Sequence, residues 1–386
     1  MSQVEYVFRT LGCWKKMRFL DKIFPLSGQR DIRMRPRIGL TGSFGRGNYG
    51  DELYVKTYQH WFGRWADLHL LTGLPQPGYL QDFGKARVDL MDAIVLGGGD
   101  LLCPYREKID RDFIHPYYLR RPLHVAGIGV ERNRPDINPN TLEAWRKFLK
   151  NRNVKSITMR DSDSKIWIDT NVAPNVEVGI APDLVCALPL PPAIRPDGPP
   201  VLGLVTRHIK HPREYKLMGE IAHKLSGQGW RVRHVIGGVG NHGRKDYENS
   251  KTLEVPGKET FYSQDLDDIS RALGECSLVL SMKLHTTIVS SMYGVPTISM
   301  NPVVKARSFM ESIGREKYVF AANDGSVFDA IDAGVPDIST DRIRKLRDDA
   351  SSYLMNLGQR IWDDFRRSNR TRAHHLSDAP SFPGSI

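Results

Sequence analysis

The sequence predicts an α/β protein built from two doubly wound, Rossmann-like domains that face each other across a cleft. From Arg37 onward, short apolar runs rich in β-branched residues alternate with helical patterns, and this alternation is typical of parallel sheets. A proline-rich stretch, residues 189–200, interrupts the alternation and is typical of a stiff linker. The alternation then restarts, so the same architecture is expected twice.

The elements of the first half follow from their apolar runs and periodicities. Strands are predicted at Arg37–Thr41, Ala93–Leu96, His124–Gly129 and Lys155–Met159. The clearest helical patterns between them are Asp51–Phe62 and Thr141–Lys150.

The second half repeats this pattern after the linker. Its strands are predicted at Val201–Thr206, Arg231–Ile236, Ser277–Ser281 and Pro296–Met300. Its helices are predicted near Arg213–Leu225, Asp265–Leu273 and Thr286–Tyr293. A last helix at Asp341–Phe365 carries apolar residues at helical spacings, so we expect it to pack back across both domains.

These elements predict the domain organisation. We expect a basic N-terminal extension (1–36), an N-terminal α/β domain (37–188), a linker (189–200), a C-terminal α/β domain (201–335), a C-terminal helix (336–368) and a disordered tail (369–386).

Composition excludes several classes of protein. Of 386 residues, 40% are hydrophobic and 26% are charged, the usual balance of a globular protein and not of a disordered one. No apolar run is long enough to span a membrane, and Glu5 and Arg9 interrupt the stretch that a signal peptide would need. Four cysteines lie far apart, which favours neither disulfides nor a metal site. We therefore expect a cytoplasmic protein without a metal or a cofactor.

The net charge of +11 predicts an anionic partner: nucleic acid, an anionic lipid surface or a phosphorylated substrate. Residues 1–37 hold nine basic and three acidic residues. Val4 to Phe24 mixes basic residues with apolar ones at helical spacings, as in a helix lying on a membrane surface or in one packed on the protein with a solvated basic face. Nucleic acid is not expected, because no recognition motif accompanies the charge.

Two glycine-rich loops follow predicted strands of the first domain. Residues 41–52 join a strand to a helix and include Gly47, Asn48, Gly50 and Asp51; glycines let a ligand approach and a helix N-terminus attracts anions. Asp51 and Glu52 could instead cap the helix. Gly97, Gly98 and Gly99 follow a buried strand, where they leave room either for a ligand or for close packing.

A third loop, in the second domain, places Lys283 and His285 at a strand end. A bound anion would favour a protonated imidazole, which could serve as a general acid. Other charged residues expected around the cleft are Arg160, Asp161, Asp183, Arg207 and His208. Each could equally form a surface or hinge ion pair.

These loops, in this order, resemble the polysaccharide pyruvyltransferase family. The matching segments are Gly47–Glu52, Val95–Gly99, Met159–Ser164, Pro182–Asp183, Ser281–His285, Gly294–Pro296 and Lys305. One departure is Lys283, where the family pattern usually has arginine; lysine keeps the charge but loses the bidentate grip on a carboxylate or phosphate.

The resemblance implies a fold like glycosyltransferase type B, phosphoenolpyruvate as donor and a sugar hydroxyl pair of a polysaccharide or lipid-linked glycan precursor as acceptor. On that basis we expect a pyruvate ketal as product, His285 as general acid, and Asp51 or Asp183 as base. Lys283, Arg160 and Arg207 would bind the donor, and the glycine loops would line the cleft. Peripheral contact with the inner membrane face is a further expectation. The rival hypothesis is a glycosyltransferase that uses a nucleotide sugar.

Overall fold

The computed structural model describes residues 34–71, 87–107, 113–132, 134–208 and 215–372. The expected basic segment up to residue 33, and with it the predicted membrane-surface helix, lies outside the described residues. So does the end of the chain after residue 372.

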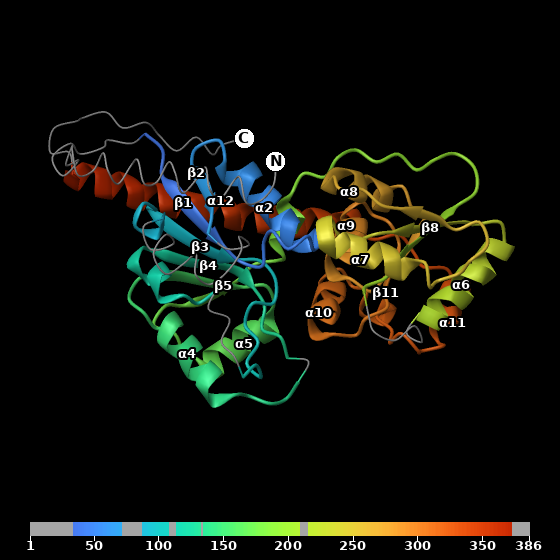
Figure 1. Cartoon of the computed structure of the whole chain (residues 1–386), viewed down its shortest axis with the longest axis horizontal. Helices are drawn as coiled ribbons and strands as arrows, with labels where there is room; N and C mark the ends of the chain where they lie inside the picture. The colour runs from blue at the N-terminus through green and yellow to red at the C-terminus, as the bar shows by residue number, and fades with distance from the viewer. Residues whose placement is uncertain (1–33, 72–86, 108–112, 133, 209–214, 373–386) are drawn as a thin grey trace.

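The N-terminal half forms one sheet of six parallel strands, in the order β2-β1-β3-β4-β5-β6 (Figure 1). The strands are β1 (Arg37–Thr41), β2 (Asp67–Leu70), β3 (Ala93–Gly97), β4 (Leu123–Ile128), β5 (Val154–Met159) and β6 (Val178–Ile180). Both faces of β3 and β4 are buried, as expected of parallel strands covered by helices on two sides.

The C-terminal half forms a second parallel sheet, in the order β11-β10-β7-β8-β9. Its strands are β7 (Val201–Val205), β8 (Arg231–Val235), β9 (Glu259–Phe261), β10 (Leu278–Ser281) and β11 (Thr297–Ser299). The two sheets therefore confirm the predicted pair of parallel α/β units, and no helix or strand lies in residues 189–200 between them.

Helices follow the strands in both halves. In the N-terminal half they are α2 (Tyr49–Phe62), α4 (Pro139–Leu149), α5 (Ser162–Asn171) and the short 3-10 helices η2 (Pro116–Arg120) and η3 (Leu184–Ala187). In the C-terminal half they are α6 (Lys216–Gly227), α7 (Gly240–Ser250), α8 (Leu266–Gly274), α9 (Leu284–Met292), α10 (Val304–Ser312), η5 (Glu316–Tyr318), α11 (Val327–Asp332) and α12 (Thr340–Arg372).

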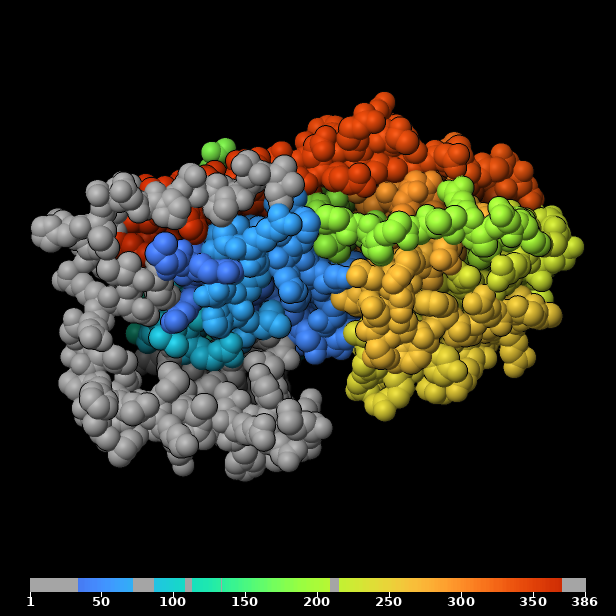
Figure 2. All heavy atoms as spheres, turned by 90° about the horizontal axis from the view of Figure 1, so that it is seen from above, coloured from blue at the N-terminus to red at the C-terminus, as the bar shows by residue number. Residues whose placement is uncertain are grey.

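Of the two hydrophobic clusters among the described residues, one spans both halves, and the other lies in the N-terminal half. A continuous cluster of buried side chains runs from β1 and α2 through η3 to β7, α9 and α12. Tyr49 on α2 is hydrogen-bonded to Ser270 on α8 at 2.6 Å, and Trp61 donates to the carbonyl of Ala187 at 3.1 Å. Figure 2 shows the N-terminal residues in blue meeting the C-terminal residues in yellow, with red C-terminal residues along one side of both.

The last helix corrects one predicted boundary. The residues of α12 that pack into the core include Leu354, Leu357, Ile361 and Trp362, so the helix packs back on the protein as expected. It continues to Arg372, which is past residue 369, where we expected a disordered tail to begin. Its final turns are strongly polar and basic in sequence, which obscured the helical signal.

Two buried histidines predict how stability depends on pH. Burial lowers the pKa of His124 to about 4 and that of His234 to about 3. An unfolded histidine titrates near pH 6.5, so below that pH the unfolded chain binds more protons than the folded chain. Above pH 6.5 these two histidines therefore do not reduce the free energy of unfolding. We expect the free energy of unfolding to fall by up to about 1.4 kcal/mol per pH unit per histidine as pH drops from about 6.5 toward 4.

Urea unfolding of the parent and of His124→Asn between pH 7.5 and pH 4.5 tests this expectation. Asparagine can keep the hydrogen bond that the ring shares with Ser156 at 2.9 Å but cannot take up a proton. The variant should show the shallower pH dependence. Equal slopes in the two proteins would contradict the expectation.

Candidate active site

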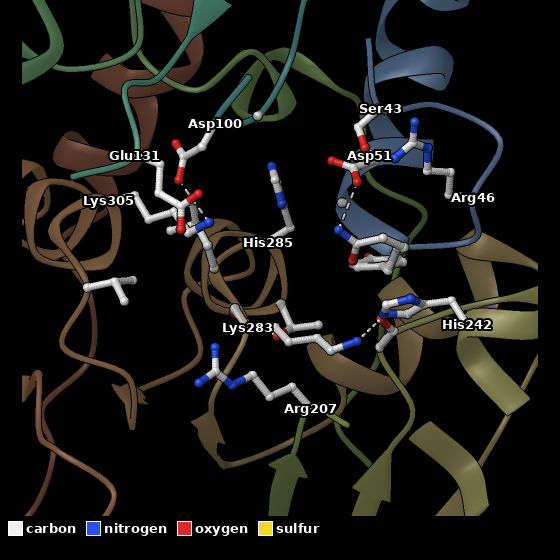
Figure 3. Close-up of a pocket in the computed structure, with 18 of the residues that line it drawn as sticks. Ser43, Arg46, Asp51, Asp100, Glu131, Arg207, His242, Lys283, His285 and Lys305 are labelled. Carbon is white, nitrogen blue, oxygen red and sulfur yellow. Dashed lines mark hydrogen bonds and ion pairs between the residues drawn. The ribbon is translucent and has the colours of Figure 1, made fainter. Parts of the chain in front are cut away.

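A cavity of about 580 Å³ lies where the carboxyl ends of the two sheets meet (Figure 3). Its lining comes from the loops after β1, β3 and β4 of the first sheet and from α7, α9, α10 and the loop after β7 of the second. Ligands bind at this edge in doubly wound folds. Figure 3 shows His285 between Asp100 and Lys305 on one side and Asp51 and Arg46 on the other.

Three helices that contribute residues to this cavity lack a capping side chain at the N-cap position. In α7, α9 and α10 the N-cap residues Val239, Lys283 and Val303 make no side-chain cap hydrogen bond, and the first turns hold no acidic residue. By contrast, Asn138 and Asp161 cap α4 and α5, which do not begin at this cavity. The first N–H group of α7, at Gly240, donates to the side chain of Gln264 at 2.8 Å. The N-termini of α9 and α10 and the helix dipoles are therefore the features that favour a bound anion.

His285, in the first turn of α9, is fixed through its Nε2 atom. That atom lies 3.3 Å from the hydroxyl oxygen of Tyr54 and 3.4 Å from Oδ2 of Asp183. Because the Tyr54 hydroxyl donates to the same Oδ2 at 2.7 Å, both neighbours present lone pairs to Nε2. We therefore assign the Nε2–H tautomer.

The other ring nitrogen, Nδ1, lies beside Gly50 in the first turn of α2. A Cβ atom at Gly50 would overlap Nδ1 and Cγ of His285, so only glycine allows the ring this position. Among the described residues no hydrogen-bond partner reaches Nδ1, and both Gly50 and His285 line the cavity. Nδ1 is thus the nitrogen able to exchange a proton with a ligand.

Asp183 is a buried acceptor and does not line this cavity. Its Oδ1 accepts from the backbone N–H of Val185 at 3.1 Å, while Oδ2 is shared by Tyr54, Arg160 and His285. Burial alone would raise the pKa of Asp183, but the interactions with His285, Arg160 and Tyr54 together hold it well below its usual range. This geometry argues against the expected role as general base and favours orientation of His285.

Arg160 is less available to a donor than expected. Its guanidinium forms ion pairs with Asp100 and, at 3.4 Å, with Asp183, and its side chain is 6% exposed. Asp100 also pairs with Lys305 at 3.0 Å. Although burial would raise the pKa of Asp100, Arg160 and Lys305 keep it low. Arg160 lines the cavity with its charge compensated by two carboxylates.

Lys283 is likewise paired. Its ammonium forms an ion pair with Asp246 of α7 and donates to the carbonyl oxygen of Gly237 at 2.7 Å. Asp246 also accepts from the backbone N–H of His208 at 2.8 Å. Burial lowers the pKa of Lys283, with Asp246 acting in the opposite direction. At the cavity wall, Lys283 therefore links its own loop to α7 and to the loop that contains Gly237, and through Asp246 to the loop that contains His208.

Arg207 is the predicted donor-binding residue with the most accessible charge. It lines the cavity, its side chain is exposed, and no described residue forms an ion pair with it. Lys245 of α7 has the same three properties, and sequence reasoning missed it because the polar, glycine-containing helix α7 was not predicted.

The glycines of the two loops serve different roles: some leave room for a ligand and others allow close packing. Gly50 and Gly99 line the cavity with Asn48. A Cβ at Gly97 would meet Tyr58 and the carbonyl of Ala126, so this glycine serves close packing. Gly47 has φ of +86° and its carbonyl accepts from Val239 of the second domain at 2.8 Å. The backbone N–H of Gly47 donates to Glu52 at 2.9 Å, which gives Glu52 the capping role.

Asp51 is the remaining candidate base. It lines the cavity, and its Oδ2 accepts from the side-chain amide of Asn48 at 2.9 Å. Sequence reasoning missed four residues that line the cavity or contact a residue that lines it. They are Tyr54, Asp100, Lys245 and Asp246. Within the described ranges, no cluster of three His, Cys, Asp or Glu side chains could hold a metal ion.

Gly50→Ala should lower turnover by about tenfold or more, because the new methyl group displaces the His285 ring from its contacts. Alanine is otherwise the better helix former by about 1 kcal/mol, so a loss would not come from α2 itself. Gly227→Ala in α6 is the matched control, since a Cβ there meets nothing within 4 Å. Steady-state kinetics with thermal unfolding of both variants make the test, and full activity of Gly50→Ala would refute it.

Comparison with known proteins gives one family match. The model of the polysaccharide pyruvyl transferase family matches residues 16–302. A search of curated proteins found no sequence match. Within the described part of the chain, no helix is both long and apolar enough to cross a membrane.

Several solved structures share the fold at low identity. A candidate UDP-N-acetylglucosamine 2-epimerase from Listeria monocytogenes is 8% identical, with a TM-score of 0.54, over 86% of this chain and 97% of its own. S. aureus MnaA, solved with UDP, is 8% identical with a TM-score of 0.52, over 81% and 89%. Sucrose-phosphate synthase from Thermosynechococcus elongatus is 10% identical with a TM-score of 0.51, over 88% and 98%. These likenesses show a fold of the glycosyltransferase B type.

Proposed function

The chain belongs to the polysaccharide pyruvyl transferase family, and from this premise we propose that it transfers pyruvate from phosphoenolpyruvate to two hydroxyl groups of a glycan, forming a ketal. The observation that carries the proposal is the cavity lined by His285, by the exposed cations Arg207 and Lys245, and by the first residues of α9 and α10, helices without a capping side chain. A donor with a carboxylate and a phosphate suits such a space.

The reaction requires a proton donor at carbon. Protonated His285 would give its Nδ1 proton to the methylene carbon of phosphoenolpyruvate, which becomes a methyl group and leaves a cationic centre at the neighbouring carbon. One sugar hydroxyl attacks that centre and loses its proton to a base, for which Asp51 is the candidate. The second hydroxyl then attacks the same carbon as the bond to phosphate breaks, and its proton leaves with the phosphate, which is released as inorganic phosphate.

The remaining charged residues would bind and position the donor. Arg207 and Lys245 offer accessible charges, and Lys305 extends toward the same space from α10. Lys283 and Arg160 would attract the donor less strongly, because the positive charge of each is partly neutralised by its carboxylate partners. A cavity with more cations than acids lowers the cost of bringing in a multiply charged donor.

Mass spectrometry of a glycan pool incubated with the protein and phosphoenolpyruvate tests the function. The expected product carries the added mass of a carboxyethylidene group, and inorganic phosphate is released with it. A parallel incubation with nucleotide sugars addresses the rival donor. Transfer of a sugar from those donors, with no reaction of phosphoenolpyruvate, would replace the proposal.

A cytoplasmic location with contact at the inner membrane face is also proposed, on the strength of the basic N-terminal composition. Each basic residue near an anionic surface contributes about 1 kcal/mol. A chain that starts at Arg35 should bind anionic liposomes more weakly than the full chain in a sedimentation assay. Equal binding by the two would dismiss membrane contact.

A further inference from the structure

A second cavity, of about 700 Å³, adjoins the first. It lies between the loops after β5 and β6 of the N-terminal half and the helices α10 and α12. Figure 1 shows α5 and α10 facing each other at the boundary between the two halves. Arg160, Leu284 and Lys305 line both cavities, so the two spaces share part of their walls.

The two cavities differ in charge. The first is bordered by seven basic residues, namely Arg46, Arg106, Arg160, Arg207, Lys245, Lys283 and Lys305, against the acids Asp51, Asp100 and Glu131. In the second, Arg160 and Lys305 are the basic residues, against the acids Asp161, Asp183, Glu311 and Asp349. A multiply charged anion is favoured in the first space and disfavoured in the second.

The second cavity offers hydrogen bonds and apolar contact together. Ser162, Ser308, Ser352 and Asn356 line it, and no described residue is hydrogen-bonded to their side chains. Phe309 and Leu346 contribute apolar surface in the same wall. Hydroxyl, amide and carboxylate groups beside apolar faces suit a neutral sugar, which carries many hydroxyls and has apolar ring faces.

The second cavity also lies close to His285, the proposed general acid. Asp183 lines the second cavity and His285 lines the first, and their Oδ2 and Nε2 atoms are 3.4 Å apart. Ser352 and Asn356 on α12 and Ser312 on α10 are exposed, so the cavity opens to solvent and leaves a path for a longer glycan. The α10 and α12 residues lie after residue 302, where the family match ends.

We infer that the second cavity binds the neutral sugar units of the acceptor glycan next to the one that is modified, while the first binds the anionic donor. This inference rests on the proposed function for the identity of the donor. It assigns Asn356 and Ser308, from opposite helices, as acceptor-binding residues.

Asn356→Trp tests the inference by filling the cavity from an exposed position on α12. Met355→Trp is the matched control, because Met355 is the preceding residue, is 42% exposed and lines neither cavity. The probe is a library of neutral oligosaccharides of hexoses and N-acetylhexosamines, with binding followed by saturation-transfer NMR and affinity by calorimetry. Ser308→Trp on α10 is a second variant that fills the same cavity, from the wall opposite α12.

The parent and Met355→Trp should bind the same oligosaccharides, and Asn356→Trp and Ser308→Trp should bind them at least tenfold more weakly. Binding of phosphoenolpyruvate should be equal in all four proteins. If oligosaccharides bind in this pattern but phosphoenolpyruvate is not used, the acceptor site stands and the proposed function falls. Equal oligosaccharide binding by parent and blocked variants, or none by the parent, would overturn the site even where pyruvyl transfer is observed.

Discussion

Replacing His285 with alanine is expected to lower the turnover of pyruvyl transfer by about a hundredfold or more, the usual scale for the loss of a general acid. The reason is geometric. Nε2 is engaged by Tyr54 and Asp183, which leaves Nδ1, beside Gly50, as the ring nitrogen without a hydrogen-bond partner among the described residues. Of the other two described histidines that line the cavity, His208 is exposed and His242 on α7 lies 3.8 Å from Asp246, so neither is held by Tyr54 and Asp183 as His285 is.

His242→Ala is therefore the matched control for His285→Ala. Both histidines line the cavity, but we assign only His285 to proton transfer. The control should retain most of the turnover and change mainly the Michaelis constant for phosphoenolpyruvate. Added imidazole should restore part of the activity of His285→Ala, since it can enter the space left by the ring and supply the missing proton donor.

Kinetics of phosphate release at saturating donor, together with circular dichroism and thermal unfolding, make this comparison. A folded His285→Ala protein with turnover close to the parent would show that another group protonates the donor. An equal loss in both variants would point to a general effect of the cavity charge.

The sheets were predictable where strands are buried on both faces. The bounds of β1 are those expected, and β3, β4 and β7 differ from the predictions by a residue or so at their ends. The short strands β2, β6 and β9 were missed because their side chains are largely half-buried or exposed, which removes the apolar run from the sequence. All three are edge strands of their sheets.

The part of the site that follows from sheet topology was predictable. Parallel strands end at one edge, so the loops after them meet there, and the comparison confirms the family that those loops resembled. The partners of His285 were not predictable, because Tyr54 is 231 positions away in the sequence and reaches it only through the packing of α2 against α9. The pairing of Lys283 with Asp246 depends in the same way on a helix that the sequence pattern did not indicate.

This cross-domain network leads to the second large expected effect. Asp183→Asn should lower turnover by about a hundredfold or more, because the amide keeps the shape of the side chain but removes the anion that holds the Nε2–H of His285. The protonated imidazole also loses a neighbouring negative charge. If His285 acts as general acid, the alkaline limb of the pH–rate profile should therefore shift to lower pH.

Asp100→Asn separates this effect from the loss of an arginine partner. Both carboxylates pair with Arg160, with side chains 9% exposed for Asp100 and 2% for Asp183, but only Asp183 contacts His285. Asp100→Asn should weaken the binding of phosphoenolpyruvate or the stability of the fold without moving the alkaline limb. Full pH–rate profiles of the parent and both variants, with folding checked by thermal unfolding, decide between the two. A limb that moves equally in both variants, or in neither, would mean that Asp183 supports the fold and does not position the histidine.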